Sequence, residues 1–409
     1  MVAVASVTAY DLAVTAPAKP AGAHPPPRRI GTVPVYEQEF WTSKQRQANP
    51  LHEVSYRGCF KPQLPAYFID RLSKPGDAVY DPFSGRGTTA VEAALMSRNV
   101  IANDVNPLSA ILTRPRLEVP LIASIDVRLR AIKLTAKRSN DIDLSMFYHP
   151  DTERELLNLR AWLAERQASG AEDDADRWIR MVATNRLTGH SPGFFSAYTL
   201  PPNQAVSAES QLKINEKTGK APEYRNVRAL ILRKSMQLQS DINAAARWRL
   251  QQAAAQAQFL QGPAAATAGI AADSVQLTVT SPPFLNVVQY AKDNWLRCWF
   301  NGLDAEAIGR GITMATTVEE WSAEMLAVLQ ELFRVTRSKG WVAFEVGEVQ
   351  RGAVKLEEAV LPLGLAAGFR CEAILINTQK FTKTSNIWGI GNNERGTNSN
   401  RIVMLQKPA

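Results

Sequence analysis

The chain has 409 residues, 45% of them hydrophobic, and a formal net charge of +8, so we expect one large domain with an insertion, or two domains. The basic balance favours a polyanionic partner, although many soluble basic proteins have none. Three scattered cysteines and four histidines without metal-ligand spacing argue against disulfides or structural zinc. No apolar run reaches the ~18 residues of a membrane span, and no secretion leader is evident, so we expect a cytoplasmic protein without metal or membrane contact.

The first part of the chain changes character near residue 34. Residues 1–33 are rich in Pro and Ala and are predicted to form a flexible tail. Further on, the sequence predicts a short strand at 79–80, a Gly-rich turn, a helix over 88–96 and a second strand over 100–104. This order is a βαβ unit, which implies a parallel sheet.

A long segment, residues 107–256, then interrupts the strand pattern. It contains helix-prone stretches near both ends, "ERELLNLRAWLAERQ" and "ALILRKSMQLQSDINAAARWRLQQAAAQAQ", around a polar and irregular middle. With residue 106 included it has 22 Lys/Arg against 16 Asp/Glu, and so most of the net charge. A charged helix is as often a solvated face as a binding surface, but the aromatic residues in the basic middle suit nucleic acid; they are Phe194, Phe195, Tyr198 and Tyr224.

The sheet pattern resumes after the insertion. Strands are predicted at 257–262, 274–280, 341–347, 371–379 and 401–406, with helices over 318–335 and 355–367. Thr317 and Glu320 form a capping box for the first of these helices, and we expect Gly340 to close it. The sum is an α/β, Rossmann-like domain with a mostly parallel seven-stranded sheet, made of residues 34–106 and 257–409 and interrupted by a mainly helical insertion.

The turn "DPFSGRGTTA" (81–90) lies at the carboxyl end of the first strand, where open α/β sheets bind ligands. A phosphate-binding P-loop is nearly excluded because no lysine follows Gly87. A nicotinamide site is allowed by the spacing of Gly85, Gly87 and Ala90. S-adenosylmethionine is favoured, because Asp81 can meet its ammonium group whereas it would repel a pyrophosphate, and Asp104 can accept the ribose hydroxyls.

A second unusual turn, "SPPF" (281–284), ends the strand 274–280. Two consecutive prolines cannot continue a strand, and their stiffness limits the motion of neighbouring groups. The Ser281 hydroxyl and the Pro282 carbonyl can accept hydrogen bonds from an amine, and Phe284 offers a flat face for a flipped base. Alone, the motif would be read as a mere turn, but a glycine-rich loop is predicted at the same sheet edge.

The two motifs together resemble those of DNA amino-methyltransferases. "DPFSGRGTT" is similar to the DPFxGxGTT motif of that family, and "SPPF" to its [DNS]PP[YFW] motif, whose Ser form is typical of the cytosine-N4 branch. "GCFKPQLPAYFIDRLSKPGD" (58–77) resembles the segment that closes over the methionine part of the cofactor, and "WGIGNNERGTNSNRIVML" (388–405) the last loop and strand. The similarity covers roughly residues 50–110 and 257–406.

The resemblance implies a sequence-specific, S-adenosyl-L-methionine-dependent methyltransferase that modifies cytosine N4 in double-stranded DNA by base flipping. It implies a possible restriction-modification context with a cognate endonuclease as a further partner. Cofactor contacts are expected at Lys61, Asp81, Phe83, Gly85, Gly87, Thr88 and Asp104, and catalytic contacts at Ser281, Pro282, Pro283 and Phe284. For DNA binding, the sequence predicts Arg225, Arg228, Arg233 and Lys234 in the insertion and Lys380 and Lys383 in the loop 380–399.

Two departures from the family keep alternatives open. The third strand ends "QGP" (261–263) where relatives often carry Gly-Asp, and the insertion comes early for a target-recognition region. The first departure puts an acidic contact to the cofactor adenine in doubt, and the second means that DNA is recognised from an unusual place or that recognition is shared with the loop 380–399. Independently of these, adenine N6 is the next target to consider, followed by an amine in RNA, which single-stranded aromatic contacts would suit. A non-catalytic DNA-binding subunit is the remaining alternative, although it need not retain both motifs.

Overall fold

A nine-stranded sheet forms the base of the molecule in a computed structural model that describes residues 27–42, 48–56, 58–200, 205–283, 290–312, 315–349, 354–378 and 399–409. The strand order is β1-β2-β10-β11-β7-β6-β3-β4-β5. Pairing is parallel from β5 through β7, whereas β11 runs antiparallel to both its neighbours. The strands are β1 (Arg28–Ile30), β2 (Val33–Gln38), β3 (Ala78–Asp81), β4 (Asn99–Asp104), β5 (Gln258–Gln261), β6 (Val275–Thr280), β7 (Thr336–Val346), β10 (Arg370–Thr378) and β11 (Ser399–Gln406).

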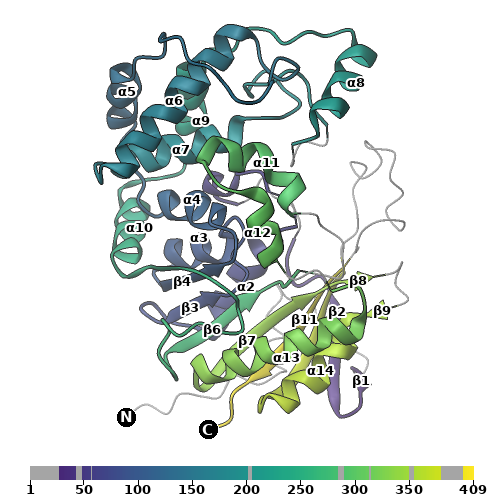
Figure 1. Cartoon of the computed structure of the whole chain (residues 1–409). Helices are drawn as coiled ribbons and strands as arrows, with labels where there is room; N and C mark the ends of the chain where they lie inside the picture. Colours follow the sequence, from purple (N-terminus) through teal and green to yellow (C-terminus); the bar gives the residue numbers. More distant parts are fainter. Residues whose placement is uncertain are drawn as a thin grey trace.

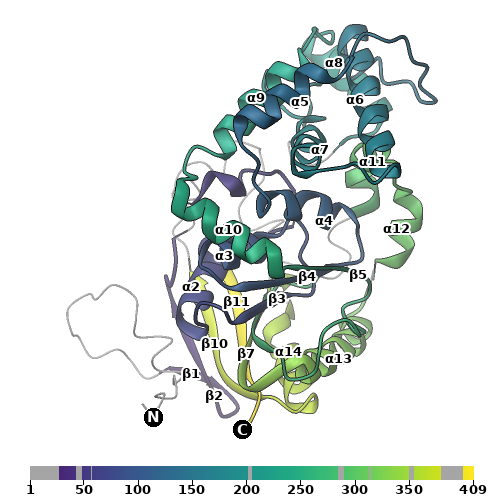
Figure 2. The ribbon, with the colours of Figure 1, turned by 90° about the vertical axis from the view of Figure 1, so that its left-hand side faces the viewer.

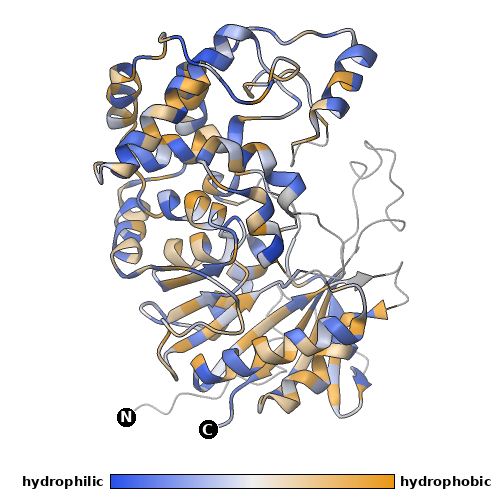
Figure 3. Ribbon diagram, viewed as in Figure 1, coloured by the Kyte–Doolittle hydropathy of each residue, from blue (hydrophilic) through white to orange (hydrophobic). Residues whose placement is uncertain are grey.

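The strands are apolar on both faces because helices cover both sides of the sheet (Figure 1). Successive side chains of a strand point to opposite faces, and the two cores divide accordingly. Val79 of β3 packs on one side and Tyr80 on the other; Ala343 of β7 and its neighbour Phe344 divide in the same way. Hydrophobic residues predominate in the strands in Figure 3, as expected for a sheet buried on both faces.

The helices that flank the sheet follow from the sequence pattern. On one face lie α2 (Gln63–Leu72), α3 (Thr88–Leu95) and α10 (Ala244–Gln256), and on the other α13 (Val318–Val335) and α14 (Leu356–Ala366). The capping box of Thr317 and Glu320 is present at the start of α13. A two-stranded ribbon of β8 (Glu348–Val349) and β9 (Val354–Lys355) precedes α14.

A layer of helices stands over one end of the sheet (Figures 1 and 2). Its core is continuous with that of the sheet face that carries α2 and α3. The helices α11 and α12 lie in this layer although they follow the SPP motif in sequence, because α11 packs against α6 and α7. The helices above the sheet are α4 (Leu108–Thr113), α5 (Ile122–Ala131), α6 (Pro150–Ala168), α7 (Asp174–Arg186), α8 (Ala208–Thr218), α9 (Val227–Leu238), α11 (Tyr290–Asn301) and α12 (Ala305–Gly311), with short 3-10 turns at Pro50–His52 and Arg114–Arg116.

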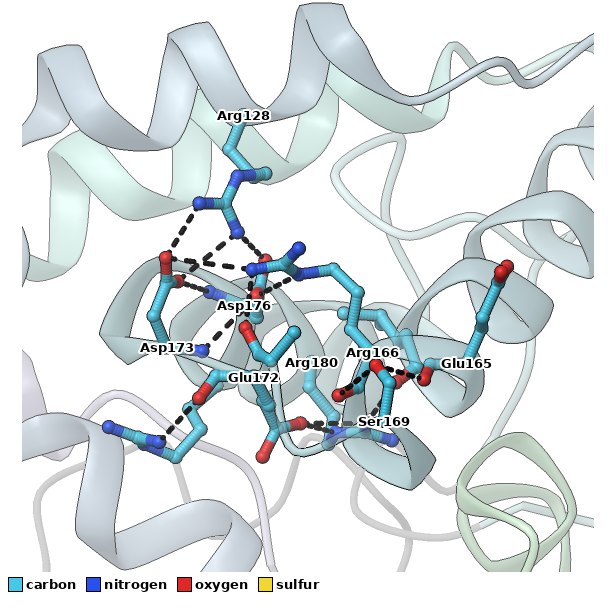
Figure 4. A network of polar contacts seen from close by, with 11 residues as sticks. Arg128, Glu165, Arg166, Ser169, Glu172, Asp173, Asp176 and Arg180 are labelled. Atoms are coloured by element: carbon cyan, nitrogen blue, oxygen red, sulfur yellow. Dashed lines mark hydrogen bonds and ion pairs between the residues drawn. The ribbon is translucent and has the colours of Figure 1, made fainter.

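Ion pairs join three helices of this layer (Figure 4). Asp176 of α7 is fully buried and accepts hydrogen bonds from Arg128 of α5 and Arg166 of α6. Arg128 also bonds Asp173, 2.6 Å away. A buried carboxylate needs such partners, so these arginines are part of the framework of the layer.

The predicted strands and the α/β class are confirmed, and the structure corrects several details. Gly340 does not close a helix, because β7 starts at Thr336 and contains it; a Cβ there would lie 3.1 Å from the carbonyl oxygen of Gln276 on β6. The sheet gains β1 and β2, and residues 28–30 of the predicted tail form β1. The last helical stretch of the insertion is two helices, α9 and α10, and α10 packs on α3 and β4 of the sheet domain. None of the described helices is long and apolar enough to cross a membrane.

Candidate active site

The two sequence motifs meet at one cavity. The strands β5-β4-β3-β6-β7 have the order 3-2-1-4-5 of a Rossmann sheet, whose direction of winding reverses between β3 and β6, and ligands bind at such switch points. A cavity of about 270 Å³ lies there, lined by Phe83, Gly85 and Asp104 and by Ser281 and Pro283. The glycine-rich turn and the SPP turn thus both line one pocket.

Asp104 holds the glycine-rich turn in place. Its two carboxylate oxygens accept the backbone N–H groups of Gly85, at 2.8 Å, and Asn106, at 2.9 Å. Burial raises the pKa of Asp104 to about 6, and these hydrogen bonds act against that rise. Gly85 has φ +52°, and a Cβ there would sit 3.6 Å from the Tyr56 ring. The glycine therefore keeps the backbone close to the cavity wall.

Gly87 is required by steric space at the start of α3, and this leads to a stability prediction. Its φ is +74°, and a Cβ would fall 2.2 Å from Oγ1 of Thr113, which is fully buried. We expect Gly87→Ala to lower the free energy of unfolding by about 2 kcal/mol or more, through strain and overpacking. Gly85→Ala meets no such clash and is the matched control, expected to cost about 1 kcal/mol. Denaturant unfolding of both variants tests this; equal losses would contradict it.

Asp81 is a structural link between the two motifs. It is only 2% exposed, and its carboxylate accepts hydrogen bonds from Thr280 Oγ1, at 2.7 Å, and from the Phe83 N–H, at 3.1 Å. Burial raises its pKa to about 7. A second link runs from Thr89 Oγ1 to the Val279 carbonyl, 3.0 Å away. These bonds fix the SPP turn relative to the glycine-rich turn.

Ser281 adjoins a buried carboxyl group from the next strand. Glu345 of β7 is 5% exposed; burial raises its pKa to about 7, and a hydrogen bond with the Ser281 side chain works in the opposite direction. Asn400 of β11 donates its amide N–H to Glu345 Oε1 at 2.9 Å. A polar chain therefore runs from β11 through β7 to the SPP turn.

A hydrogen bond from helix α13 also holds the SPP turn. The Pro283 carbonyl accepts a hydrogen bond of 2.9 Å from the indole N–H of Trp321, a buried residue of α13. Pro282 is buried next to it. Phe284 lies outside the described residues, as do Lys380 and Lys383.

The residues that line the cavity fit S-adenosyl-L-methionine. Asp104 retains lone pairs toward the cavity for hydroxyl groups, and the walls are apolar where they come from Phe83, Pro263 and Ala264. A Cβ on Gly85 would lie 3.6 Å from the ring of Tyr56, which also lines the cavity. Among the described residues, no cluster of His, Cys, Asp or Glu could hold a metal ion.

The structure separates the predicted cofactor residues into two groups. Phe83, Gly85 and Asp104 line the cavity. The other four do not line it: Lys61, Asp81, Gly87 and Thr88. Thr88 is buried at the first turn of α3, and the pKa of Lys61 is lowered by partial burial and by Arg86. The predicted contact between Asp81 and the cofactor ammonium stays a prediction; within the protein, the Asp81 carboxylate accepts hydrogen bonds from Thr280 and Phe83.

The predicted DNA-binding residues of α9 and the segment before it are mostly engaged elsewhere. Lys234 is 7% exposed and contacts Glu53 at 3.3 Å. Arg225 pairs with Glu223 at 2.8 Å, and Arg228 donates to the Ile132 carbonyl. Arg233 is exposed. Binding of DNA by this group stays a prediction, with Arg233 as the member that faces solvent.

The aromatic residues of the insertion divide in the same manner. Phe194 and Phe195 are buried, and the Arg186 guanidinium lies 3.9 Å from the Phe194 ring centroid. Gly189 leaves room for that ring, since a Cβ there would be 2.4 Å from it. These two phenylalanines are core residues and offer no face to a base, whereas Tyr224 is 46% exposed.

Sequence reasoning missed several residues of the site. Glu345 carried a usable signal, because a lone carboxyl group in the apolar strand "WVAFEVG" needs a partner. Thr280 directly precedes the SPP motif. Trp321, Asn400 and Tyr56 gave no signal, since only the packing of distant segments brings Tyr56 to the cavity, Trp321 to Pro283 and Asn400 to Glu345.

Comparison with known proteins finds sequence similarity over part of the chain. Residues 30–110 match the family model N6_N4_Mtase, described as DNA methylase. Type II methyltransferase M.MjaII from Methanocaldococcus jannaschii is 35% identical over 77 residues, which make up 19% of this chain and 14% of that protein. The chain thus aligns with well under two thirds of this relative.

Solved structures of methyltransferases show weaker likeness. TrmN from Thermus thermophilus has 13% identity and a TM-score of 0.34, over 89% of this chain and 53% of that chain. A SAM-dependent methyltransferase from Methanosarcina mazei has 10% identity and a TM-score of 0.33, over 83% of this chain and 97% of that chain.

Proposed function

We propose that this chain, whose residues 30–110 match a family model described as DNA methylase, is a sequence-specific methyltransferase that acts on the exocyclic N4 amine of cytosine in double-stranded DNA. The observation that carries the proposal is the single cavity lined both by Gly85 and Asp104 and by Ser281 and Pro283. A cofactor on the first pair and a flipped base on the second would be neighbours.

The residues of the cavity have distinct roles in this proposal. Gly85 and Asp104 bind the cofactor, which supplies an electrophilic methyl group when bound. Ser281 accepts a hydrogen bond from the target amine and so favours the pyramidal nitrogen that can attack. The ionised carboxylate of Glu345 accepts a hydrogen bond from the Ser281 hydroxyl. This hydrogen bond orients the hydroxyl so that the lone pairs of the Ser281 oxygen face the target amine.

The chain also keeps the acceptor in position before the reaction. The Trp321 indole holds the Pro283 carbonyl, and Thr280 is fixed by Asp81. Ser281 therefore has little freedom to move, and little reorganisation is needed when charge develops on the nitrogen. Serine is a weak base, so the amine proton leaves to solvent after transfer.

Mass spectrometry of nucleosides tests the proposal directly. DNA and RNA are digested from cells that express the wild-type chain and from cells that express Ser281→Ala. We expect N4-methylcytosine in DNA from the wild type and a strong reduction with the variant. N6-methyladenine would move the assignment to adenine, and modified nucleosides in RNA alone would refute a DNA substrate.

A further inference from the structure

A second cavity lies in the helical layer and is distinct in its charge. It has a volume of about 560 Å³ and is bordered by the segment after α5, by α6 and α7, and by the carboxyl end of α11. We call it the basic groove. Its cationic lining residues are Lys137, Arg138, Arg160 and Arg180, and none of its lining residues in the described part of the chain is acidic.

Three of these cations keep a charge that no carboxylate neutralises within the described residues. Arg180 is excluded, because Glu172 lies 2.7 Å from it. Arg138 donates to Asn158 Oδ1 at 3.0 Å, which is a neutral partner. The Arg160 guanidinium lies 4.9 Å from the centre of the Trp299 ring, and Lys137 is exposed. An anion with several acceptor oxygens would satisfy this arrangement.

Several other cations of the helical layer are already compensated. Arg128 and Arg166 belong to the network of Figure 4. Arg177 pairs with Glu118 at 2.8 Å, and Lys213 with Glu209 at 2.7 Å. The groove therefore collects positive charge that the layer does not use for its own stability.

The helix α11 lies in the chain between the SPP turn and the groove. It starts at Tyr290, seven residues after Pro283, and ends at Asn301 in the groove lining. Twelve helical residues span about 18 Å at 1.5 Å per residue. One strand of B-DNA advances about 3.4 Å per phosphate, so this length corresponds to roughly five nucleotides.

We propose that the basic groove binds backbone phosphates of the DNA duplex whose target base enters the cavity at Ser281. This inference rests on the proposed function and assigns part of the duplex contact to Lys137, Arg138 and Arg160. The half-buried Trp299 keeps the Arg160 guanidinium flat and oriented, as stacking does for this group. Phosphate contacts of this kind set position and affinity and carry no base specificity.

The test is the double variant Lys137→Gln/Arg160→Gln, in which neither side chain has a hydrogen bond to lose among those the structure describes. We expect duplex binding at 0.1 M salt to weaken at least about tenfold, and the slope of log affinity against log salt to fall by about 1.8. The matched control is Lys74→Gln/Lys339→Gln, which removes two exposed charges near the amino ends of β3 and β7. It should leave both quantities unchanged.

Methyl transfer at saturating duplex separates this inference from the proposed function. The groove variant should keep the wild-type rate there and show only a raised KM for DNA. If the wild type methylates duplex DNA while the groove variant matches it in KM and salt slope, the groove proposal is wrong. A wild type that binds RNA and ignores duplex DNA would overturn the groove proposal and the DNA substrate together. An equal loss of duplex affinity in the Lys74→Gln/Lys339→Gln control would also overturn the groove proposal, because the effect would then be one of net charge.

Discussion

Ser281→Ala is expected to bind cofactor and DNA like the wild type and to transfer the methyl group on the order of 100-fold more slowly. The substitution leaves both prolines, the Trp321 anchor and the Asp81–Thr280 link in place. What it removes is one acceptor aimed at the target amine, whose worth is greatest as the nitrogen changes geometry. Single-turnover methylation with excess enzyme measures the transfer step without product release.

Ser84→Ala is the control for this substitution. Ser84 also lies in a turn beside the cavity, is 5% exposed, and its hydroxyl has no hydrogen-bond partner within the described residues. Its loss should be close to neutral for the transfer step. A wild-type rate in Ser281→Ala would show that the SPP turn serves only the backbone.

Glu345→Gln is expected to stabilise the protein at alkaline pH while it slows methyl transfer. The folded-state pKa of Glu345 is about 7, above its ordinary value of 4.5. Between these two pH values Glu345 is therefore protonated in the folded chain and ionised in the unfolded chain. The free energy of unfolding therefore falls as pH rises from about 4.5 to 7, by up to about 3 kcal/mol. Glutamine does not ionise and escapes this loss. In urea unfolding at pH 5 and pH 8, the free energy of unfolding of the variant relative to the wild type should be higher at pH 8 than at pH 5.

The pH dependence of transfer gives the same variant a second readout. In the wild type the single-turnover rate should rise through about pH 7. Glu345 ionises in this range, and its carboxylate then accepts a hydrogen bond from the Ser281 hydroxyl. Glu345→Gln should be slow and flat over this range. Asn400→Ala removes the other hydrogen bond to the carboxylate and should move the midpoint to higher pH, since a bond to the charged form lowers the pKa. An unchanged midpoint in Asn400→Ala, with a rising rate in Glu345→Gln, would remove Glu345 from the reaction.

The insertion illustrates that a count of charges along the sequence does not locate them on one surface. Arg225, Arg228, Arg233 and Lys234 form a basic run in the sequence. In the structure Lys234 is buried against Glu53, and Arg228 is bound to a carbonyl group. Helical periodicity scatters neighbours in sequence over different faces, so a run of cations does not define one surface. The basic groove instead joins Lys137, Arg160 and the end of α11, which lie far apart in the chain.

Several features of this protein depend on local chemistry alone and could be predicted from short stretches of sequence. The apolar strands, the capping box at Thr317 and the two glycines at positive φ follow from short segments, because backbone geometry and burial are set by neighbouring residues. The α/β class follows from their order, since parallel strands need helical crossovers. The glycine-rich turn (81–90) and the SPP turn were likewise predicted from short sequence motifs.

The contacts between groups from distant segments could not be predicted in this way, because they depend on how the whole chain packs. The pairing of Glu345 with Ser281, the anchoring of Pro283 by Trp321 and the use of Asp81 as a link to Thr280 all join residues from separate strands and helices. The same is true of the incorporation of α11 into the helical layer. Such contacts depend on strand order and on the packing of distant elements, and no local pattern records them. For this protein, the chain encodes the two motifs in short segments, and the sheet brings them to one cavity.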